Sequence, residues 1–211
     1  GLGKSHLVRE VDALGGIMAQ ATDASGIQYR TLNTRKGFAV QALRVQCDRD
    51  KYKKAIQDIL QTTTIHIEED EVIDLVVEKN KATGVILKHS KTLTSKKIIL
   101  TTGTFLNGVM YTGEENSQGG RVGDKSAIPL SKRLYELKLP MGRLKTGTPA
   151  RIKLSSIDLE VMEEQPGETP TPHMSLLQPP LKQLPQISCH ITRTNPQTHQ
   201  IIKNNTHLSA M

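Results

Sequence analysis

The sequence is poor in aromatic residues and in cysteine, and it has no long apolar run. Among its 211 residues there are no Trp, two Phe and two Cys. The core must therefore be built mainly from aliphatic side chains. No run approaches the roughly 20 apolar residues that a membrane-spanning helix needs, so we expect neither a membrane span nor a signal peptide. Cys47 and Cys189 show no motif spacing, which favours two structural thiols in a reducing compartment.

The chain also lacks an initiating Met, because it begins at Gly1 within glycine-rich sequence. The stretch Gly1–Ser5 resembles the end of a phosphate-binding P-loop, but the strand and the first glycine of that motif are not in the sequence. We interpret the chain as part of a longer protein and leave the P-loop alternative open. Its length is enough for one domain, or for one domain and part of a second.

Acidic residues are missing between residues 24 and 47, while the whole chain carries a formal net charge of +7. This acid-free segment contains four cations: Arg30, Arg35, Lys36 and Arg44. Such a segment is either a solvated face or a site for an anionic partner such as RNA. Both interpretations stay open.

Apolar periodicity is clear up to about residue 139. It predicts a first helix that buries Leu7, Val8, Val11 and Leu14 and ends at Gly15. A strand around residues 27–31 follows, and then a helix capped by Asp48. Between residues 64 and 101 the pattern predicts a small antiparallel meander.

A further helix is expected to start at Pro129, where its fixed φ angle suits the first helical position. Residues 155–185 contain several prolines and predict a linker or an irregular insertion. After it, residues 187–194 predict a strand and residues 198–205 a short helix.

The most informative stretch runs from Lys96 to Asp124. It opens with Ile98–Leu100, which predicts a buried strand, and Gly103 follows at the carboxyl end, where α/β sheets bind ligands. The later segment Gly119–Asp124 reads GGRVGD. Its glycines leave backbone N–H groups uncovered beside one cation and one carboxylate, which suits a phosphate-rich ligand. Each piece alone is also compatible with an ordinary glycine-rich turn, but together they favour a nucleotide site.

A second polar loop covers residues 142–151 and contains Arg143, Lys145 and Thr146. Its cations and hydroxyl groups indicate a further phosphate or substrate contact. The histidines at 190, 199 and 207 do not have metal-ligand spacing, so we predict structural roles for them and no metal site.

Six segments of the sequence occur in a familiar order: GLGKSHLVREVDALGG, RKGFAVQALRVQCDRDKY, TTGTFLNG, GGRVGD, GRLKTGTPARI and CHITRTN. Over essentially the whole chain they resemble the GidA/MnmG family, the FAD-dependent enzymes of tRNA uridine carboxymethylaminomethyl modification. The motifs GRLKTGTP and HLVREVDALGG are the most specific of the set. The resemblance implies an α/β fold. Residues 1–153 would form part of a doubly wound, glutathione-reductase-like FAD-binding domain with a small β-meander, and residues 154–211 the start of an insertion domain.

The resemblance also implies a function, namely part of a flavoenzyme that modifies C5 of the tRNA wobble uridine. It implies FAD as cofactor, NADH as reductant and a carbon derived from methylenetetrahydrofolate. The implied partners are tRNA, a GTPase subunit and a second copy in a homodimer of the full-length form. The implied location is the bacterial cytoplasm or, in a eukaryote, the mitochondrion. Two alternatives stay open: a non-catalytic RNA- or protein-binding remnant of the family, and a general FAD or NAD oxidoreductase.

The family's cofactor contacts carry over to a set of positions in this chain, with Val72 contributing its backbone. The predicted cofactor-binding residues are Val72, Gly103, Gly119, Gly120, Arg121, Gly123, Asp124 and Ala127. Arg143, Lys145 and Thr146 would line the site near the flavin or the RNA, and the four cations of the acid-free segment are candidate RNA contacts.

No residue is assigned a catalytic role, because Cys47 and Cys189 match neither cysteine segment of the family. The chain departs from the family pattern at Phe38 and Ala150, where proline is usual. It also departs at Lys125–Ala127, where the family has Pro-Pro-Ser. The first GxGxxG fingerprint of the family is not in the sequence.

Overall fold

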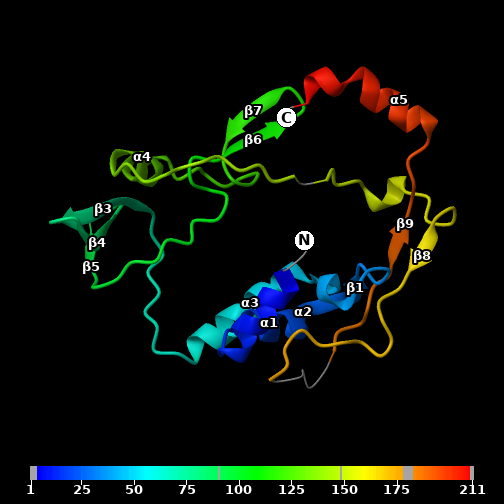
Figure 1. Cartoon of the computed structure of the whole chain (residues 1–211), viewed down its shortest axis with the longest axis horizontal. Helices are drawn as coiled ribbons and strands as arrows, with labels where there is room; N and C mark the ends of the chain where they lie inside the picture. The colour runs from blue at the N-terminus through cyan, green and yellow to red at the C-terminus, as the bar shows by residue number, and fades with distance from the viewer. Residues whose placement is uncertain (1–3, 90, 148, 178–182, 210–211) are drawn as a thin grey trace. The chain divides into compact units, whose positions relative to one another are not determined.

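The computed structural model describes residues 4–89, 91–147, 149–177 and 183–209. The chain folds as two compact units, each assembled from two separate stretches of sequence (Figure 1). Unit 1 comprises Gly1–His66 and Arg151–Arg193, and unit 2 comprises Ile67–Ala150 and Thr194–Met211. This division reflects packing. The predicted functional division at residue 153 stays a prediction.

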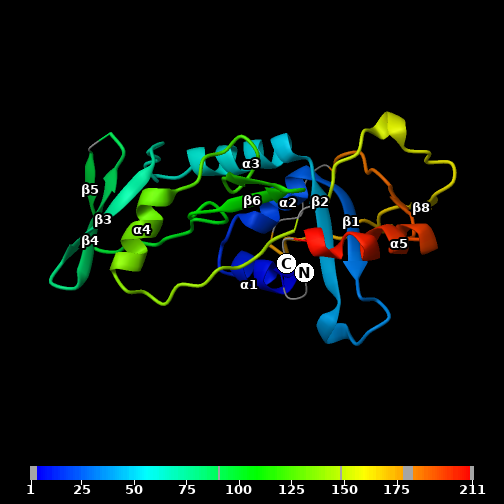
Figure 2. The ribbon, with the colours of Figure 1, turned by 90° about the horizontal axis from the view of Figure 1, so that it is seen from above.

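Unit 1 combines helices with a long β-hairpin. Its elements are α1 (Lys4–Ala13), α2 (Met18–Ser25), β1 (Gly26–Leu32), η1 (Phe38–Val40), β2 (Ala42–Cys47), α3 (Arg49–Gln61), η2 (Leu154–Ser156), β8 (Glu163–Gln165) and β9 (Cys189–Ile191). Strands β1 and β2 pair antiparallel, as do β8 and β9. Figure 2 shows β1 and β2 side by side, with their turn at the lower end of the ribbon. The core consists of Ala19, Tyr29, Leu43 and Met174.

Several local predictions for unit 1 are confirmed. Gly15 follows α1 with φ +87°, and the Asp48 side chain accepts hydrogen bonds from the amides of Asp50 (3.1 Å) and Lys51 (3.0 Å) at the start of α3. The predicted buried face of α1 is wrong, because Leu7 and Leu14 are exposed by 61% and 88%. The helix instead buries its polar residues Ser5 and Asp12, and the Asp12 carboxylate binds a segment from much later in the chain.

Unit 2 contains two small antiparallel sheets and two α-helices within the described residues. Its elements are β3 (Val72–Glu78), β4 (Lys81–Leu87), β5 (Thr92–Thr94), β6 (Val109–Thr112), β7 (Glu115–Gln118), α4 (Ile128–Glu136), α5 (Pro196–Asn204) and η3 (Thr206–Leu208). Strands β3, β4 and β5 form the predicted meander, and Pro129 lies in the first turn of α4. The core of the unit joins Leu75 of β3 to Leu130 and Leu134 of α4.

The buried strand expected at Ile98–Leu100 does not form. Ile99 is 85% exposed, although Ile98 packs against the core of unit 2. A central strand of a parallel sheet needs a hydrogen-bonded neighbour on each edge. Every sheet in the described parts of the chain is antiparallel, and the parallel pairing there is a single bridge between Leu106 and Ala127. The meander predicted between residues 64 and 101 begins only at Val72, the first residue of β3.

Candidate nucleotide-binding site

Two loops of unit 2, residues 102–108 and 119–127, bind each other through their backbones and form what we call the glycine junction. Three hydrogen bonds join them: from the amide of Ala127 to the carbonyl of Phe105 (2.9 Å), from Asn107 to Ala127 (3.2 Å), and from Gly119 to Gly108 (3.0 Å). The structure therefore brings together the two sequence pieces that predicted a nucleotide site.

The close approach of these loops depends on glycine. A Cβ atom on Gly120 would lie 2.7 Å from Cδ1 of Phe105 and 2.8 Å from the carbonyl oxygen of Thr104. A Cβ atom on Gly108 would lie 2.5 Å from that same oxygen. All three distances are too short for a Cβ atom, so neither position accepts a larger residue without movement of its neighbours. Gly103 (φ +60°) and Gly123 (φ +87°) also adopt left-handed conformations that favour glycine.

The charged groups of the GGRVGD segment pair with each other. One Arg121 Nη lies 2.6 Å from a carboxylate oxygen of Asp124, and the Asp124 amide donates to the Arg121 carbonyl at 3.0 Å. The two side chains are 55% and 37% exposed. An ion pair this exposed contributes at most about 1 kcal/mol. Arg121 can therefore exchange its carboxylate partner for a ligand phosphate at small cost.

The core of unit 2 positions two further predicted cofactor contacts. Val72 lies on β3, at an edge of the three-stranded sheet, and packs against the cluster formed by Leu75, Leu130 and Leu134. Ala127 immediately precedes α4, which carries two of those leucines. The same packing therefore fixes β3 and the start of α4, where the helix dipole favours an anion.

Of the three predicted substrate contacts, Arg143 reaches the glycine junction. Its two terminal nitrogens both lie 3.3 Å from the carbonyl oxygen of Asn107, to which they donate. Lys145 and Thr146 follow in an exposed irregular segment. The structure thus places one guanidinium of the GRLKTGTP motif beside the glycine loops.

The four cations of the acid-free segment all lie on or beside the β1–β2 hairpin of unit 1. Arg30 and Arg44 stand opposite each other in the strand register. The Arg30 guanidinium donates to the carbonyl of Pro166 at 3.1 Å, so it takes part in holding the fold. Arg35 and Lys36 are exposed in the turn. The hairpin therefore divides the set into one anchored arginine and three exposed cations.

Sequence reasoning missed a pair of buried carboxylates in unit 1, which we call the carboxylate clamp. Asp23 accepts hydrogen bonds from the amides of Met174 (2.8 and 3.0 Å) and Ser175 (2.8 Å). Asp12 accepts from the Ser175 hydroxyl (2.9 Å) and the Leu176 amide (2.9 Å). Each carboxylate is 1% exposed. More than 150 residues separate the partners in sequence, so no local pattern could have shown this contact.

The two cysteines are free thiols in different polar surroundings. Burial is the main cause that raises the pKa of the Cys47 thiol, although hydrogen bonds with Ser25 and Thr22 oppose it. A thiol with a raised pKa is a poor nucleophile at neutral pH, which agrees with a structural role for Cys47. The Cys189 sulfur accepts from Nε2 of Gln46 at 2.9 Å and donates to Oε1 of Gln28 at 3.1 Å.

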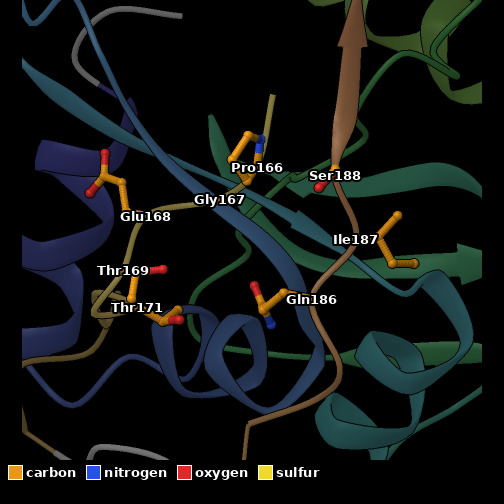
Figure 3. A pocket seen from close by; sticks show the side chains of 8 residues that line it. All are labelled: Pro166, Gly167, Glu168, Thr169, Thr171, Gln186, Ile187 and Ser188. Carbon is orange, nitrogen blue, oxygen red and sulfur yellow. The ribbon is translucent and has the colours of Figure 1, made fainter. Parts of the chain in front are cut away.

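A small pocket in unit 1 lies outside the predicted site. Its volume is about 120 Å³, and it lies between residues 166–171 and 186–188 (Figure 3). Binding sites for drug-sized ligands usually measure roughly 300 Å³ or more, so this pocket is too small for a dinucleotide. One of its lining residues, Glu168, is already engaged, because its carboxylate accepts from the amide and the hydroxyl of Thr31.

No group of three or more His, Cys, Asp or Glu side chains that could hold a metal ion occurs among the described residues. Within the same residues, no helix is long and apolar enough to cross a membrane.

Comparison with known proteins identifies the family. The family model described as "Glucose inhibited division protein A" (GIDA) matches residues 1–211. GidA from Aquifex aeolicus in its form I crystal is 40% identical and covers 100% of this chain, with a TM-score of 0.89. The form II crystal gives 40% identity over 98% of the chain, with a TM-score of 0.87. The chain spans 36% of the length of the Aquifex aeolicus chain in either crystal form. These matches confirm the predicted α/β class as part of the GidA fold. The chain therefore belongs to the GidA family.

Proposed function

We propose that this chain supplies part of the FAD site of a flavoenzyme that modifies C5 of the wobble uridine in tRNA. The glycine junction carries the proposal, because it joins two glycine-containing loops immediately before a helix N-terminus. Family membership supports the link to flavin and tRNA. When bound, FAD supplies reversible redox chemistry to the reaction.

The residues present fit an anionic dinucleotide. Within residues 119–127 the amides of Gly119, Asp124 and Ala127 already donate to backbone carbonyls, so the candidate neutral donors are those of Gly120 and Gly123, and Arg121 provides an exposed guanidinium. Donors of this kind bind phosphate without a dedicated pocket of side chains. Gly103, with φ +60°, allows a sharp turn at the start of the first loop. Val72 contributes backbone groups from β3, which is an edge strand of its sheet.

Arg143 has a role distinct from the cofactor loops. Its guanidinium is held by the Asn107 carbonyl yet remains exposed, which leaves donors for an anionic group of the substrate. A planar guanidinium suits the phosphate oxygens of RNA, where it donates in pairs. We assign Arg143, with Lys145 and Thr146 after it, to the side of the site that meets the flavin or the RNA.

The remaining parts of the proposal rest on family membership. They are NADH as the reductant, a one-carbon unit derived from methylenetetrahydrofolate, a GTPase partner and a homodimer of the full-length protein. The proposed location is the bacterial cytoplasm or the mitochondrion. The proposed functional division also rests on family membership. It assigns residues 1–153 to an FAD-binding part and residues 154–211 to an insertion part.

Complementation tests this function. The full-length protein that contains this sequence is expressed in a bacterial strain that lacks its own gene of the family. Nucleosides from the strain's tRNA are then analysed by mass spectrometry. We expect the carboxymethylaminomethyl uridine to return, and to be lost again with Gly120→Ala but not with Asp58→Ala, which removes an exposed ion pair outside the site. A purified protein that carries FAD but restores no modified uridine would favour a general oxidoreductase. A protein that binds tRNA without FAD would favour a non-catalytic remnant.

A further inference from the structure

The two phenylalanines of the chain have opposite surroundings. The Phe105 ring packs within the glycine junction, where a Cβ on Gly120 would touch it. Phe38 lies in η1, at the turn of the β1–β2 hairpin, and is 89% exposed. The Phe38 ring therefore makes little contact with the rest of unit 1 and is open to a ligand.

The turn that carries Phe38 is held in shape by its own polar groups. We call residues 33–41 the basic turn. Asn33 has φ +62°, and its side-chain amide donates to the carbonyl of Val40 at 3.1 Å. Its backbone carbonyl accepts from the Lys36 amide at 2.9 Å. Gln41 donates from its side chain to the Lys36 carbonyl at 3.2 Å. Because these bonds cross the loop, the ring is presented on an ordered support, which lowers the entropic cost of binding.

The charged residues of the hairpin itself have one sign, and the nearest acid that binds it from another segment, Glu168, is engaged by Thr31 on β1. Arg35 and Lys36 precede Phe38 and are exposed, and Arg44 is exposed on β2. No acidic residue occurs between residues 24 and 47. An aromatic face flanked by cations matches single-stranded nucleic acid, in which unpaired bases stack on rings and phosphates follow at each step. Paired bases are already stacked on each other and offer no free face.

We propose that the basic turn binds a single-stranded loop of RNA, with one unpaired base stacked on Phe38 and neighbouring phosphates on Arg35 and Lys36. This inference rests on the proposed function, which makes tRNA the substrate. The inference adds that a single-stranded RNA loop is the part that the basic turn contacts. Arg30 is excluded from the contact set, because its guanidinium already serves the Pro166 carbonyl.

The test separates the stacking contact from the ionic contacts. The full-length protein is titrated against an RNA stem–loop in which one loop base is the fluorescent analogue aminopurine, and against a fully paired RNA duplex. Loss of one stacked base weakens binding by roughly 5- to 150-fold. We expect Phe38→Ala and Phe38→Leu to weaken stem–loop binding within this range, to abolish the quenching of aminopurine, and to leave duplex binding unchanged. Phe38→Tyr should retain both binding and quenching.

The ionic contacts have a different signature. Each lost phosphate contact lowers the slope of log affinity against log salt by about 0.7 for single strands. Lys36→Ala should therefore reduce the slope by about 0.7, whereas Phe38→Leu should leave it unchanged. Stem–loop binding that is equal in wild type and Phe38→Leu would overturn the inference while leaving tRNA as the substrate. Binding of anionic lipid vesicles or of a protein that depends on Phe38, without RNA binding, would overturn both.

Discussion

The glycine junction and the carboxylate clamp solve the same problem with different chemistry. Each holds a loop against a segment distant in sequence. The glycine junction uses backbone-to-backbone hydrogen bonds and leaves its surface open. The clamp uses two carboxylates, each 1% exposed, that accept hydrogen bonds from residues 174–176. The junction uses the amides of Asn107, Gly119 and Ala127 to join its own loops and keeps the exposed guanidinium of Arg121 at its surface, whereas the clamp uses its donors to close unit 1.

The difference predicts where substitutions act. Changes in the clamp should mainly alter the stability of unit 1, because its polar groups are buried and fully engaged. Changes in the junction should mainly alter the affinity for FAD, because its ion pair is exposed and its glycines shape a binding surface.

Loss of the Asp23 carboxylate should have the largest effect. Asp23→Ala leaves the buried amides of Met174 and Ser175 without acceptors, and each such group costs about 1–3 kcal/mol. We expect unfolding of unit 1 to become easier by about 3 kcal/mol or more, measured by denaturant titration and by hydrogen exchange at residues 174–176. The matched control is Asp58→Ala, which removes an exposed ion pair with Lys54 and should cost under about 1 kcal/mol. Equal effects of the two substitutions would show that the clamp is not needed.

Gly120→Ala should come next. The added methyl group meets the Phe105 ring and the Thr104 carbonyl, and overpacking of this kind costs about 1–3 kcal/mol. Since the loops must separate to relieve the contact, we expect FAD affinity to fall by roughly tenfold or more, while the stability of unit 1 is unchanged. In Gly142→Ala the new methyl group meets nothing within 4 Å, so this variant should bind FAD normally. A Gly120→Ala protein with wild-type FAD affinity would argue against the junction as the site.

Arg121→Ala distinguishes a ligand contact from a loop contact. A charge-assisted hydrogen bond to phosphate contributes about 1.5–3 kcal/mol, so we expect about a tenfold or greater loss of FAD affinity by fluorescence titration. Asp124→Asn, which frees Arg121 from its partner, should not weaken FAD binding. Should both single variants and the double variant lose affinity equally, the ion pair serves the loop and Arg121 makes no contact with the cofactor.

The smallest predicted effect concerns pH and Cys47. Burial raises the pKa of the Cys47 thiol, and the nearby Asp23 charge adds to this direction. The folded protein therefore favours the protonated thiol. This contribution to stability is complete below the ordinary thiol pKa and is lost as pH rises through the raised value. We expect alkylation of folded Cys47 to reach half its maximal rate at a higher pH than in the unfolded chain, and Asp23→Asn to lower that pH. A midpoint at or below the unfolded one would indicate an activated thiol.

How much the sequence predicts depends on whether the signal is local. Asp48, Gly15 and Pro129 mark helix ends through their own conformational preferences, and the structure confirms all three. The glycines of TTGTF and GGRVGD are visible in the sequence and indicated a shared nucleotide site, but only the structure shows that the two loops bind each other. The buried face of α1 was mispredicted because it contains Asp12. The Asp12 carboxylate can be buried only because Ser175 and Leu176, far away in the sequence, donate hydrogen bonds to it. The Ile98–Leu100 segment is apolar, but a strand also requires hydrogen-bonded neighbours.

Hydrogen exchange on the full-length protein, with and without FAD, tests the central claim most directly. Backbone amides that bind a ligand exchange more slowly in its presence. The account predicts that FAD protects the amides of the segment from Gly119 to Ala127 and of Gly103, while residues 174–176 are already protected without it and change little. FAD that protects other segments and leaves residues 119–127 unchanged would contradict the assignment of the glycine junction as part of the cofactor site.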